Sequence, residues 1–290
     1  MDGETLTLAH GPLRFTAHAL GSGPLVVCLH GFPDNAMSFR NQLPALAEAG
    51  FRAVSVTLRG YEPSSQPAEG DYSLASLAGD VIAWLDQLGS DSAHLIGHDW
   101  GAAIAYTAGA AAPERFESLT TIAVPHAGRF VNEAIRFPRQ LALSWYMGFF
   151  QLRGLAEQVV ARHDHRFLRT LWRRWSPGWA VPAGVLEGVI ETFREPGVTT
   201  AALAYYRAAL APGAFTPAAR AAARFKVPVR TLAITGDRDG CIDTHVFERL
   251  MYPQDFPGGL RLERIREAGH FVHQERPDVV NALILEWLQP

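Results

Sequence analysis

Five residues at 97–101, with the sequence Gly-His-Asp-Trp-Gly, constrain the fold of this chain more than any other stretch. An apolar segment at 93–96 precedes them and a run of small residues at 102–112 follows, which predicts a strand, a sharp turn and a helix. Such a turn presents its central side chain at the C-terminal edge of a parallel sheet, and its glycines let strand and helix pack closely. Here that residue is Asp99, whose ionised carboxylate attacks carbon without a base to deprotonate it. The alternative is that Asp99 only caps the helix.

The rest of the chain alternates between strand-like and helix-like segments. Two short alternating segments, 5–8 and 14–18, predict a hairpin at a sheet edge, and the continuous apolar run at 25–29 predicts a strand buried on both faces. Further strands are expected at 52–58, 119–124, 229–235 and 260–265, and helices at 39–48, 74–88, 244–250 and 279–288. The alternation predicts an α/β fold with a mostly parallel, doubly wound sheet.

The alternation stops at 126 and resumes near 225. The segment between contains no convincing strand and is rich in Trp, Phe, Arg and Ala, which favours several helices separated by Gly and Pro. We therefore expect one core domain formed by 1–125 and 225–290, with a helical segment, 126–224, inserted after the sixth strand.

The composition narrows the class of protein. With 48% hydrophobic residues, 19% charged residues and a net charge of −3, the chain reads as globular, and nothing indicates a nucleic-acid partner. Its two cysteines, Cys28 and Cys241, are far apart in sequence, which favours a reducing, cytoplasmic setting. We see no signal peptide and no apolar run long enough to span a membrane. Association of the chain into a homodimer is a further possibility that the composition allows.

A nucleophilic Asp99 needs a site that holds the negative charge formed when its ester is hydrolysed. In this architecture one backbone N–H comes from the residue after the nucleophile, Trp100. The loop at 30–33, His-Gly-Phe-Pro, follows an earlier strand and offers the N–H of Phe32 as the second donor. His30 itself is expected to be a buried structural residue.

Hydrolysis of the ester also needs a base and a group that orients it. His270 follows the last strand, at the sheet edge where Asp99 lies, and His273 is its close competitor. Asp239 follows the preceding strand and is favoured as the orienting carboxylate, whereas Asp237 is expected to serve the turn or to pair with Arg238. The order nucleophile, acid, histidine is typical of α/β-hydrolases. The segment 163–165, His-Asp-His, has poor spacing for a metal site, so no metal is expected.

With these residues in place, the sequence resembles the epoxide hydrolase branch of the α/β-hydrolase superfamily. The motifs that carry the resemblance span nearly the whole chain: His-Gly-Phe-Pro at 30–33, Arg-Gly-Tyr at 59–61, Gly-His-Asp-Trp-Gly at 97–101, Gly-Asp-Arg-Asp at 236–239 and Gly-His-Phe at 269–271. The resemblance implies that 126–224 forms a helical cap over the core. It also implies an apolar substrate pocket, and we expect Phe32, Trp100, Trp145, Phe149 and Phe150 to line it.

Epoxide hydrolases use two cap tyrosines to donate hydrogen bonds to the epoxide oxygen. One lies four residues before the Phe of a Phe-Gln pair, which places it at Tyr146, because Phe150 precedes a glutamine here. The other directly precedes an arginine late in the cap, which places it at Tyr206, with Tyr205 as the alternative. The resemblance thus implies conversion of a small apolar epoxide and water to a vicinal diol, with no metal or organic cofactor.

Two other functions remain open at this point. A haloalkane-type dehalogenase would use the same nucleophile, but Phe32 stands where such enzymes commonly carry Asn, and Trp100 stands where fluoroacetate dehalogenases usually carry Arg. A binding protein that retained this framework for a small ligand is the second alternative. Thr57, in place of a common Asp, and 151–154, Gln-Leu-Arg-Gly, depart from the family pattern and leave the substrate preference open.

Overall fold

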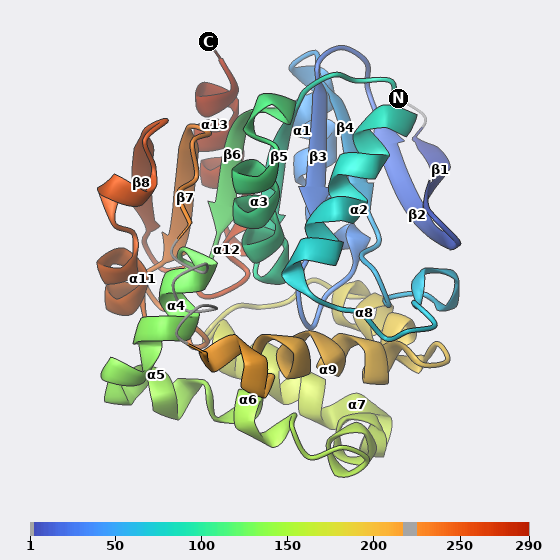
Figure 1. Cartoon of the computed structure of the whole chain (residues 1–290), viewed down its shortest axis with the longest axis vertical. Helices are drawn as coiled ribbons and strands as arrows, with labels where there is room; N and C mark the ends of the chain where they lie inside the picture. The colour runs from blue at the N-terminus through green and yellow to red at the C-terminus, as the bar shows by residue number, and fades with distance from the viewer. Residues whose placement is uncertain (1–2, 217–224, 290) are drawn as a thin grey trace.

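The computed structural model describes residues 3–216 and 225–289. At its centre is an eight-stranded sheet with the order β1-β2-β4-β3-β5-β6-β7-β8 (Figure 1). The strands are β1 (Glu4–His10), β2 (Leu13–Leu20), β3 (Leu25–Leu29), β4 (Arg52–Val56), β5 (Ala93–His98), β6 (Phe116–Ile122), β7 (Thr231–Gly236) and β8 (Leu260–Ile265). β2 pairs antiparallel with β1 and with β4, and all other pairs are parallel. The predicted fold class is confirmed.

Helices cover both faces of the sheet. On one face, α2 (Leu74–Gln87) and α3 (Trp100–Ala111) pack against the strands, and on the other lie α1 (Gln42–Glu48), α12 (Val272–Glu275) and α13 (Pro277–Leu288) (Figure 1). α11 (Thr244–Leu250) joins β7 to β8. The helix expected at 39–48 begins later, because a 3₁₀ turn, Ala36–Phe39, precedes α1 and leaves Pro44 in the first turn, where proline is tolerated.

Strand burial follows the sequence pattern. All five residues of β3, Leu-Val-Val-Cys-Leu, are buried, as expected for a strand with helices on both sides. β2 instead alternates between buried residues and more accessible ones, which suits a strand near the sheet edge. Because β3, β5, β6, β7 and β8 are parallel, the loops that follow them meet at one edge of the sheet.

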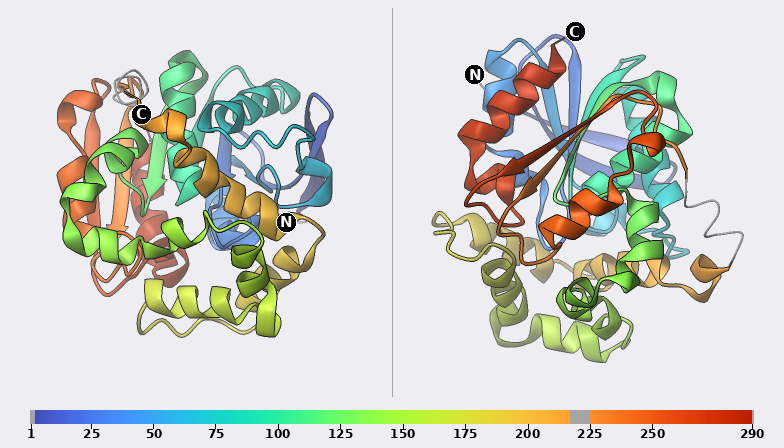
Figure 2. Two further views of the ribbon diagram at one scale, coloured as in Figure 1. Left: turned by 60° about the horizontal axis from the view of Figure 1, so that its bottom comes forward. Right: turned by 90° about the vertical axis from the view of Figure 1, so that its left-hand side faces the viewer.

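Between β6 and β7 the described residues form helices and no strand. They are α4 (Ala127–Glu133), α5 (Pro138–Leu143), α6 (Trp145–Phe149), α7 (Leu155–Trp175), α8 (Val185–Arg194) and α9 (Val198–Ala209), with 3₁₀ turns at Ala134–Arg136 and Pro212–Phe215. These helices extend across the end of the sheet where the parallel strands finish (Figures 1 and 2). Residues 217–224 of the predicted insertion lie outside the described residues.

The His-Asp-His segment at 163–165, which the sequence analysis set aside as a metal site, lies within α7. The 163–165 segment is not regular helix, since all three residues have left-handed backbones inside α7, and Asp164 pairs with Arg169 and Arg194. Among residues 3–216 and 225–289, no group of three or more His, Cys, Asp or Glu side chains is arranged so that it could hold a metal ion. Within the same ranges, no helix is both long and apolar enough to cross a membrane.

Candidate active site

Asp99 occupies the turn between β5 and α3 with φ 53° and ψ −116°, a strained conformation for a residue with a side chain. Its N–H donates to the Ile122 carbonyl at 3.1 Å, and its own carbonyl accepts from the N–H groups of Ala102 and Ala103. The side chain makes no capping hydrogen bond to α3, so the helix-cap alternative is wrong. The carboxylate is therefore not engaged by the helix, and its role as a nucleophile stays a prediction.

Three glycines make this turn sterically feasible. A Cβ on Gly31 would lie 2.4 Å from the Cβ of Asp99, and one on Gly97 would lie 2.1 Å from the Gly101 carbonyl oxygen. A Cβ on Gly101 would lie 2.0 Å from the Leu29 carbonyl oxygen. These distances are far below van der Waals contact, so β3, β5 and α3 can approach this closely only with glycine at the three positions.

The loop after β3 provides a hydrogen-bond donor to the Asp99 carboxylate. The N–H of Phe32 donates a 2.7 Å hydrogen bond to Oδ1 of Asp99. This contact supports the predicted role of the Phe32 N–H, while the N–H of Trp100, at the start of α3, stays a prediction. His30 in the same loop is a structural residue: its Nε2 accepts from the Leu58 N–H at 3.1 Å, and burial lowers its pKa to about 4.

His270 lies between two carboxylates. Its Nδ1 is 2.9 Å from Oδ2 of Asp239, and its Nε2 is 3.5 Å from Oδ2 of Asp99. The remaining oxygen of Asp239 accepts from the N–H groups of Cys241 and Ile242, at 2.7 and 2.9 Å, so this carboxylate is fixed by its own loop. Burial lowers the pKa of His270, but the two carboxylates outweigh it and raise that pKa to about 10.

The competing residues of these loops have other partners. His273 lies on α12 with Nε2 at 2.8 Å from the Ser38 hydroxyl, and burial lowers its pKa to about 3. Asp237 accepts from the N–H of Glu267 and so serves the turn. His98 donates to the backbone carbonyl of His270 at 3.0 Å, and burial lowers its pKa well below the usual value. The geometry therefore favours His270 and Asp239.

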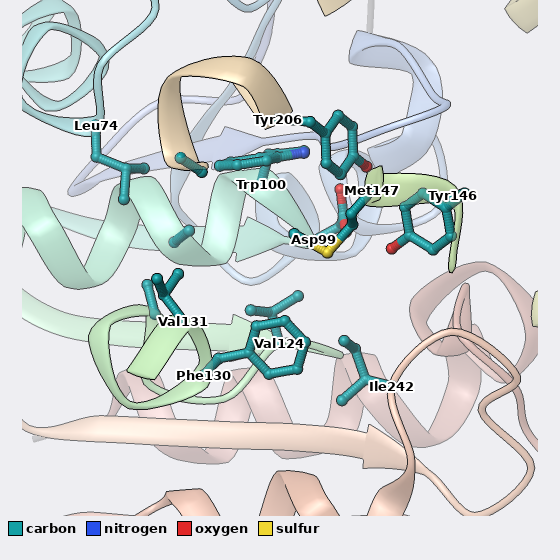
Figure 3. Close-up of a pocket in the computed structure, with 13 residues that line it drawn as sticks. Leu74, Asp99, Trp100, Val124, Phe130, Val131, Tyr146, Met147, Tyr206 and Ile242 are labelled. Carbon is teal, nitrogen blue, oxygen red and sulfur yellow. The ribbon is translucent and has the colours of Figure 1, made fainter. Parts of the chain in front are cut away.

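Tyr146 on α6 and Tyr206 on α9 reach the same site, and in Figure 3 both hydroxyls lie near Asp99. The two rings are 5.7 Å apart between centroids. The Tyr146 hydroxyl lies 3.3 Å from Sγ of Cys241, whereas the buried Tyr206 hydroxyl has no hydrogen-bond partner among the described residues. Burial, with a further contribution from the Asp99 charge, raises the pKa of both tyrosines well above the usual value. Both therefore stay protonated and able to donate at neutral pH.

Tyr205, the alternative second donor, points elsewhere. Its hydroxyl donates to the Arg59 carbonyl oxygen at 2.7 Å, and its ring packs against Tyr61 and Tyr72. Because this hydroxyl is already committed to the backbone, the geometry favours Tyr206.

A narrow, almost wholly apolar cavity of about 70 Å³ opens on the Asp99 carboxylate (Figure 3). It is lined by Leu74, Asp99, Trp100, Ala103, Val124, Ala127, Phe130, Val131, Tyr146, Met147, Tyr206, Ala209 and Ile242. The residues from α4 and the loop after β6 were not predicted from sequence. The only available signal was their apolar character directly after a strand that ends at the sheet edge where Asp99 lies.

Several aromatic residues expected to line this cavity do not. Trp145 is 46% exposed because it lies on the outer side of α6, which is a correction to the prediction. Phe149 packs against Phe167 near Trp145, away from the cavity lining. Phe32 and Phe150 are fully buried and pack edge-on against each other and against Tyr206, so they support the tyrosine from behind. Of the five predicted residues, only Trp100 lines the cavity.

Comparison with known proteins gives a consistent result. A family model described as alpha/beta hydrolase fold matches residues 24–277. Human Epoxide hydrolase 4 is 32% identical over 286 residues, covering 96% of this chain and 76% of that protein. Epoxide hydrolase 3 from Siraitia grosvenorii is 31% identical over 315 residues, covering 98% of each chain. The solved structure of an epoxide hydrolase from an endophytic Streptomyces has a TM-score of 0.83 and 28% identity, covering 99% of this chain and 95% of that one. The chain is thus an enzyme of the epoxide hydrolase family within the α/β-hydrolase superfamily.

Proposed function

We propose that this enzyme converts a small apolar epoxide and water to a vicinal diol through an ester on Asp99. The observation that carries the proposal is the convergence of one carboxylate and two tyrosine hydroxyls on a single apolar cavity, with His270 beside the carboxylate. Relatives named as epoxide hydrolases support the activity in broad terms. The sequence of steps and the roles of the residues are our inference.

In the first step, an oxygen of Asp99 attacks an epoxide carbon from the side opposite the C–O bond that breaks. The electron pair of that bond moves to the epoxide oxygen, a poor leaving group unless it is hydrogen-bonded or protonated. Tyr146 and Tyr206 are neutral phenols beside the nucleophile, so they donate hydrogen bonds to this oxygen, and one gives it a proton. The product is a hydroxyalkyl ester of Asp99.

In the second step, His270 takes a proton from water, and the resulting hydroxide attacks the ester carbonyl carbon of Asp99. The N–H groups of Phe32 and Trp100 hold the oxyanion of the tetrahedral intermediate, and the 2.7 Å contact of Phe32 with Oδ1 places one donor at that oxygen. Collapse of the intermediate releases the diol and regenerates the carboxylate with one oxygen from water. The second proton of the water passes to the departing alkoxide, and His270 keeps the first, which restores the imidazolium of the free enzyme.

The two steps are linked through the charge on Asp99. In the free enzyme both carboxylates help to raise the pKa of His270 to about 10. Esterification of Asp99 removes one of these charges, so it lowers that pKa and favours the neutral imidazole that can accept a proton from water. The proton that His270 gives up passes to the tyrosinate left by ring opening, so His270 becomes a base when an ester is present to hydrolyse.

The decisive experiment uses a single turnover of the wild-type enzyme with styrene oxide in water enriched in ¹⁸O. The first diol released should carry the unlabelled oxygen of Asp99, because the nucleophile and not the solvent opens the ring. Asp99→Ala should abolish diol formation. Solvent oxygen in the first product, or full activity of Asp99→Ala, would overturn the covalent mechanism.

Variants of the two tyrosines test the proposal against the alternatives. A dehalogenase expels a halide that needs no proton, so Tyr146→Phe and Tyr206→Phe would leave halide release from haloalkanes unchanged. A protein that only binds ligand would bind styrene oxide without forming diol. We expect diol formation that depends on both tyrosines, and halide release without such dependence would contradict the proposal.

We further propose that the cap is the inserted segment 126–224 and that 1–125 with 225–290 forms the catalytic core. The position of the described helices between β6 and β7 supports this division. The expectations of a cytoplasmic setting and of a homodimer stay predictions.

A further inference from the structure

Cys241 occupies an unusual position, because it contacts machinery for both steps of the proposed reaction. Its backbone N–H donates to Oδ1 of Asp239 at 2.7 Å, and its side chain lies 3.3 Å from the hydroxyl of Tyr146. The residue is completely buried and makes no disulfide. One residue of the core therefore connects the carboxylate that orients His270 with a proton donor supplied by the inserted helices.

A second contact fixes this arrangement. Gln140 on α5 is fully buried, and its Nε2 donates to the Cys241 carbonyl at 3.0 Å, while its Oε1 accepts from the Asp243 N–H at 2.8 Å. Its Nε2 also donates to the hydroxyl of Ser144, directly before α6. The Gln140 amide thus ties the loop that carries Cys241 to the segment that carries Tyr146. The thiol has little freedom to leave the phenol hydroxyl.

A thiol is suited to form a weak hydrogen bond that the Tyr146 hydroxyl can exchange for one to the substrate. Sulfur is a weak acceptor and S–H a weak donor, so a contact with a thiol can orient a phenol without holding it strongly. Burial keeps the Cys241 thiol protonated by raising its pKa well above the usual value, so both roles are available to it. When an epoxide oxygen arrives, the tyrosine can turn its O–H to that stronger acceptor, and the S–H can donate to the phenol oxygen in return.

We propose that Cys241 is a positioning residue for ring opening: its thiol holds the Tyr146 hydroxyl toward Asp99 and yields it to the epoxide oxygen. The inference deepens the proposed function and rests on it. It predicts an effect on formation of the ester and none of comparable size on its hydrolysis, although Cys241 lies only two residues from Asp239.

The test measures ring opening separately from hydrolysis. In a His270→Gln background the ester accumulates, so intact-protein mass spectrometry after rapid quenching with styrene oxide gives the rate of ester formation. Cys241→Ala should slow this rate by about three- to tenfold, the range expected for one lost hydrogen bond. Cys241→Ser should give an intermediate rate, because a hydroxyl orients the phenol but releases it less readily. Cys28→Ala, a buried free cysteine in β3, is the matched control and should not change it.

A double-mutant cycle separates positioning from general disruption. In a Tyr146→Phe background, Cys241→Ala should have no further effect on ester formation, because no hydroxyl remains to be positioned. With His270 intact, the rate of ester hydrolysis in Cys241→Ala should stay within about twofold of wild type. An equal loss in the Tyr146→Phe background, or an equal loss in hydrolysis, would show a structural role and overturn the inference.

The outcomes also separate this inference from the proposed function. If Tyr146→Phe itself leaves ester formation unchanged, the role of Tyr146 in the proposed function fails. If Tyr146→Phe slows ester formation and Cys241→Ala does not, the proposed function stands and the role of Cys241 is wrong. Melting temperatures of all variants show whether each is folded when its rate is measured.

Discussion

Nε2 of His270 lies 3.5 Å from Oδ2 of Asp99, so the proposed base directly faces the proposed nucleophile. In the proposed mechanism His270 activates water after Asp99 has been alkylated. We expect His270→Gln to open the epoxide once and to stop there, which lowers turnover by about 10²- to 10⁴-fold. The ester would appear as one added substrate mass on the intact protein.

His273→Gln is the matched control for that experiment. His273 is also fully buried, but its ring contacts the Ser38 hydroxyl and not the nucleophile. This variant should lose stability without accumulating ester. Accumulation in His273→Gln, or an unmodified mass in His270→Gln under single-turnover conditions, would contradict the assignment of the base.

Asp239→Asn tests the orienting carboxylate. Since Asp239 raises the pKa of His270, its neutralisation should move the acidic limb of the pH profile of turnover, which the proposed base sets, to lower pH. Turnover should fall by about 10²- to 10⁴-fold, because the imidazole loses its orientation and the stabilisation of its charged form. Asp237→Asn, which alters only a partner of the Glu267 amide, should change neither the profile nor the rate by more than about twofold.

The neighbouring tyrosines of α9 should respond differently to loss of the hydroxyl. Tyr206→Phe removes a group with no hydrogen-bond partner among the described residues, so it should slow ester formation by roughly 10-fold or more with stability unchanged. Tyr205→Phe removes the hydrogen bond to the Arg59 carbonyl, so it should lower the free energy of unfolding by about 1 kcal/mol. Rapid-quench kinetics and urea denaturation give both quantities, and the reverse pattern would exchange the two roles.

Gly31→Ala should damage the nucleophile directly. The added methyl carbon would lie 2.5 Å from Oδ1 of Asp99, so either the carboxylate or the loop after β3 must move. We expect a loss of about 1–3 kcal/mol in the free energy of unfolding and at least a tenfold fall in the rate of ester formation. Gly79→Ala within α2, whose added carbon would meet no atom closer than 3.6 Å, should instead stabilise the protein by up to about 1 kcal/mol. Equal behaviour of the two variants would refute the steric argument.

Stability should depend on pH through His270. Its pKa rises from 6.5 to about 10 on folding, so the folded state binds the proton more tightly than the unfolded chain. The resulting stabilisation is complete below about pH 6.5 and is lost as the pH rises to about 10. The free energy of unfolding, measured in urea across this range, should therefore decline, and His270→Gln should reduce the decline. An equal slope in that variant would show that other groups dominate.

The sequence predicted the residues that depend on the sheet. Asp99, Asp239 and His270 each follow a strand, and parallel strands bring their C-terminal ends to one edge wherever the remaining residues lie. Motif spacing was enough for these three because the intervening geometry is regular. Tyr146 and Tyr206 required the family resemblance, since nothing in a helical segment alone shows which phenol faces the core.

The inserted helices account for what could not be predicted. α6 has only five residues, so its sequence does not define which side is buried, and Trp145 proved to lie on the outer side. Phe130 and Met147 line the cavity because two short helices meet the end of the sheet, which is a tertiary relationship with no local periodicity. The contact between Cys241 and Tyr146 joins residues 95 positions apart and has no signature in either segment.

Both phenols of the site belong to α6 and α9, whereas the groups that we propose to cleave the ester belong to loops of the sheet. This division has an evolutionary consequence. Substitutions in the inserted segment can change which electrophile the enzyme accepts. The loop residues proposed to activate water can meanwhile be inherited unchanged. Differences in substrate between such enzymes should then correspond mainly to sequence differences in the insertion. The loops of the sheet should differ less in sequence.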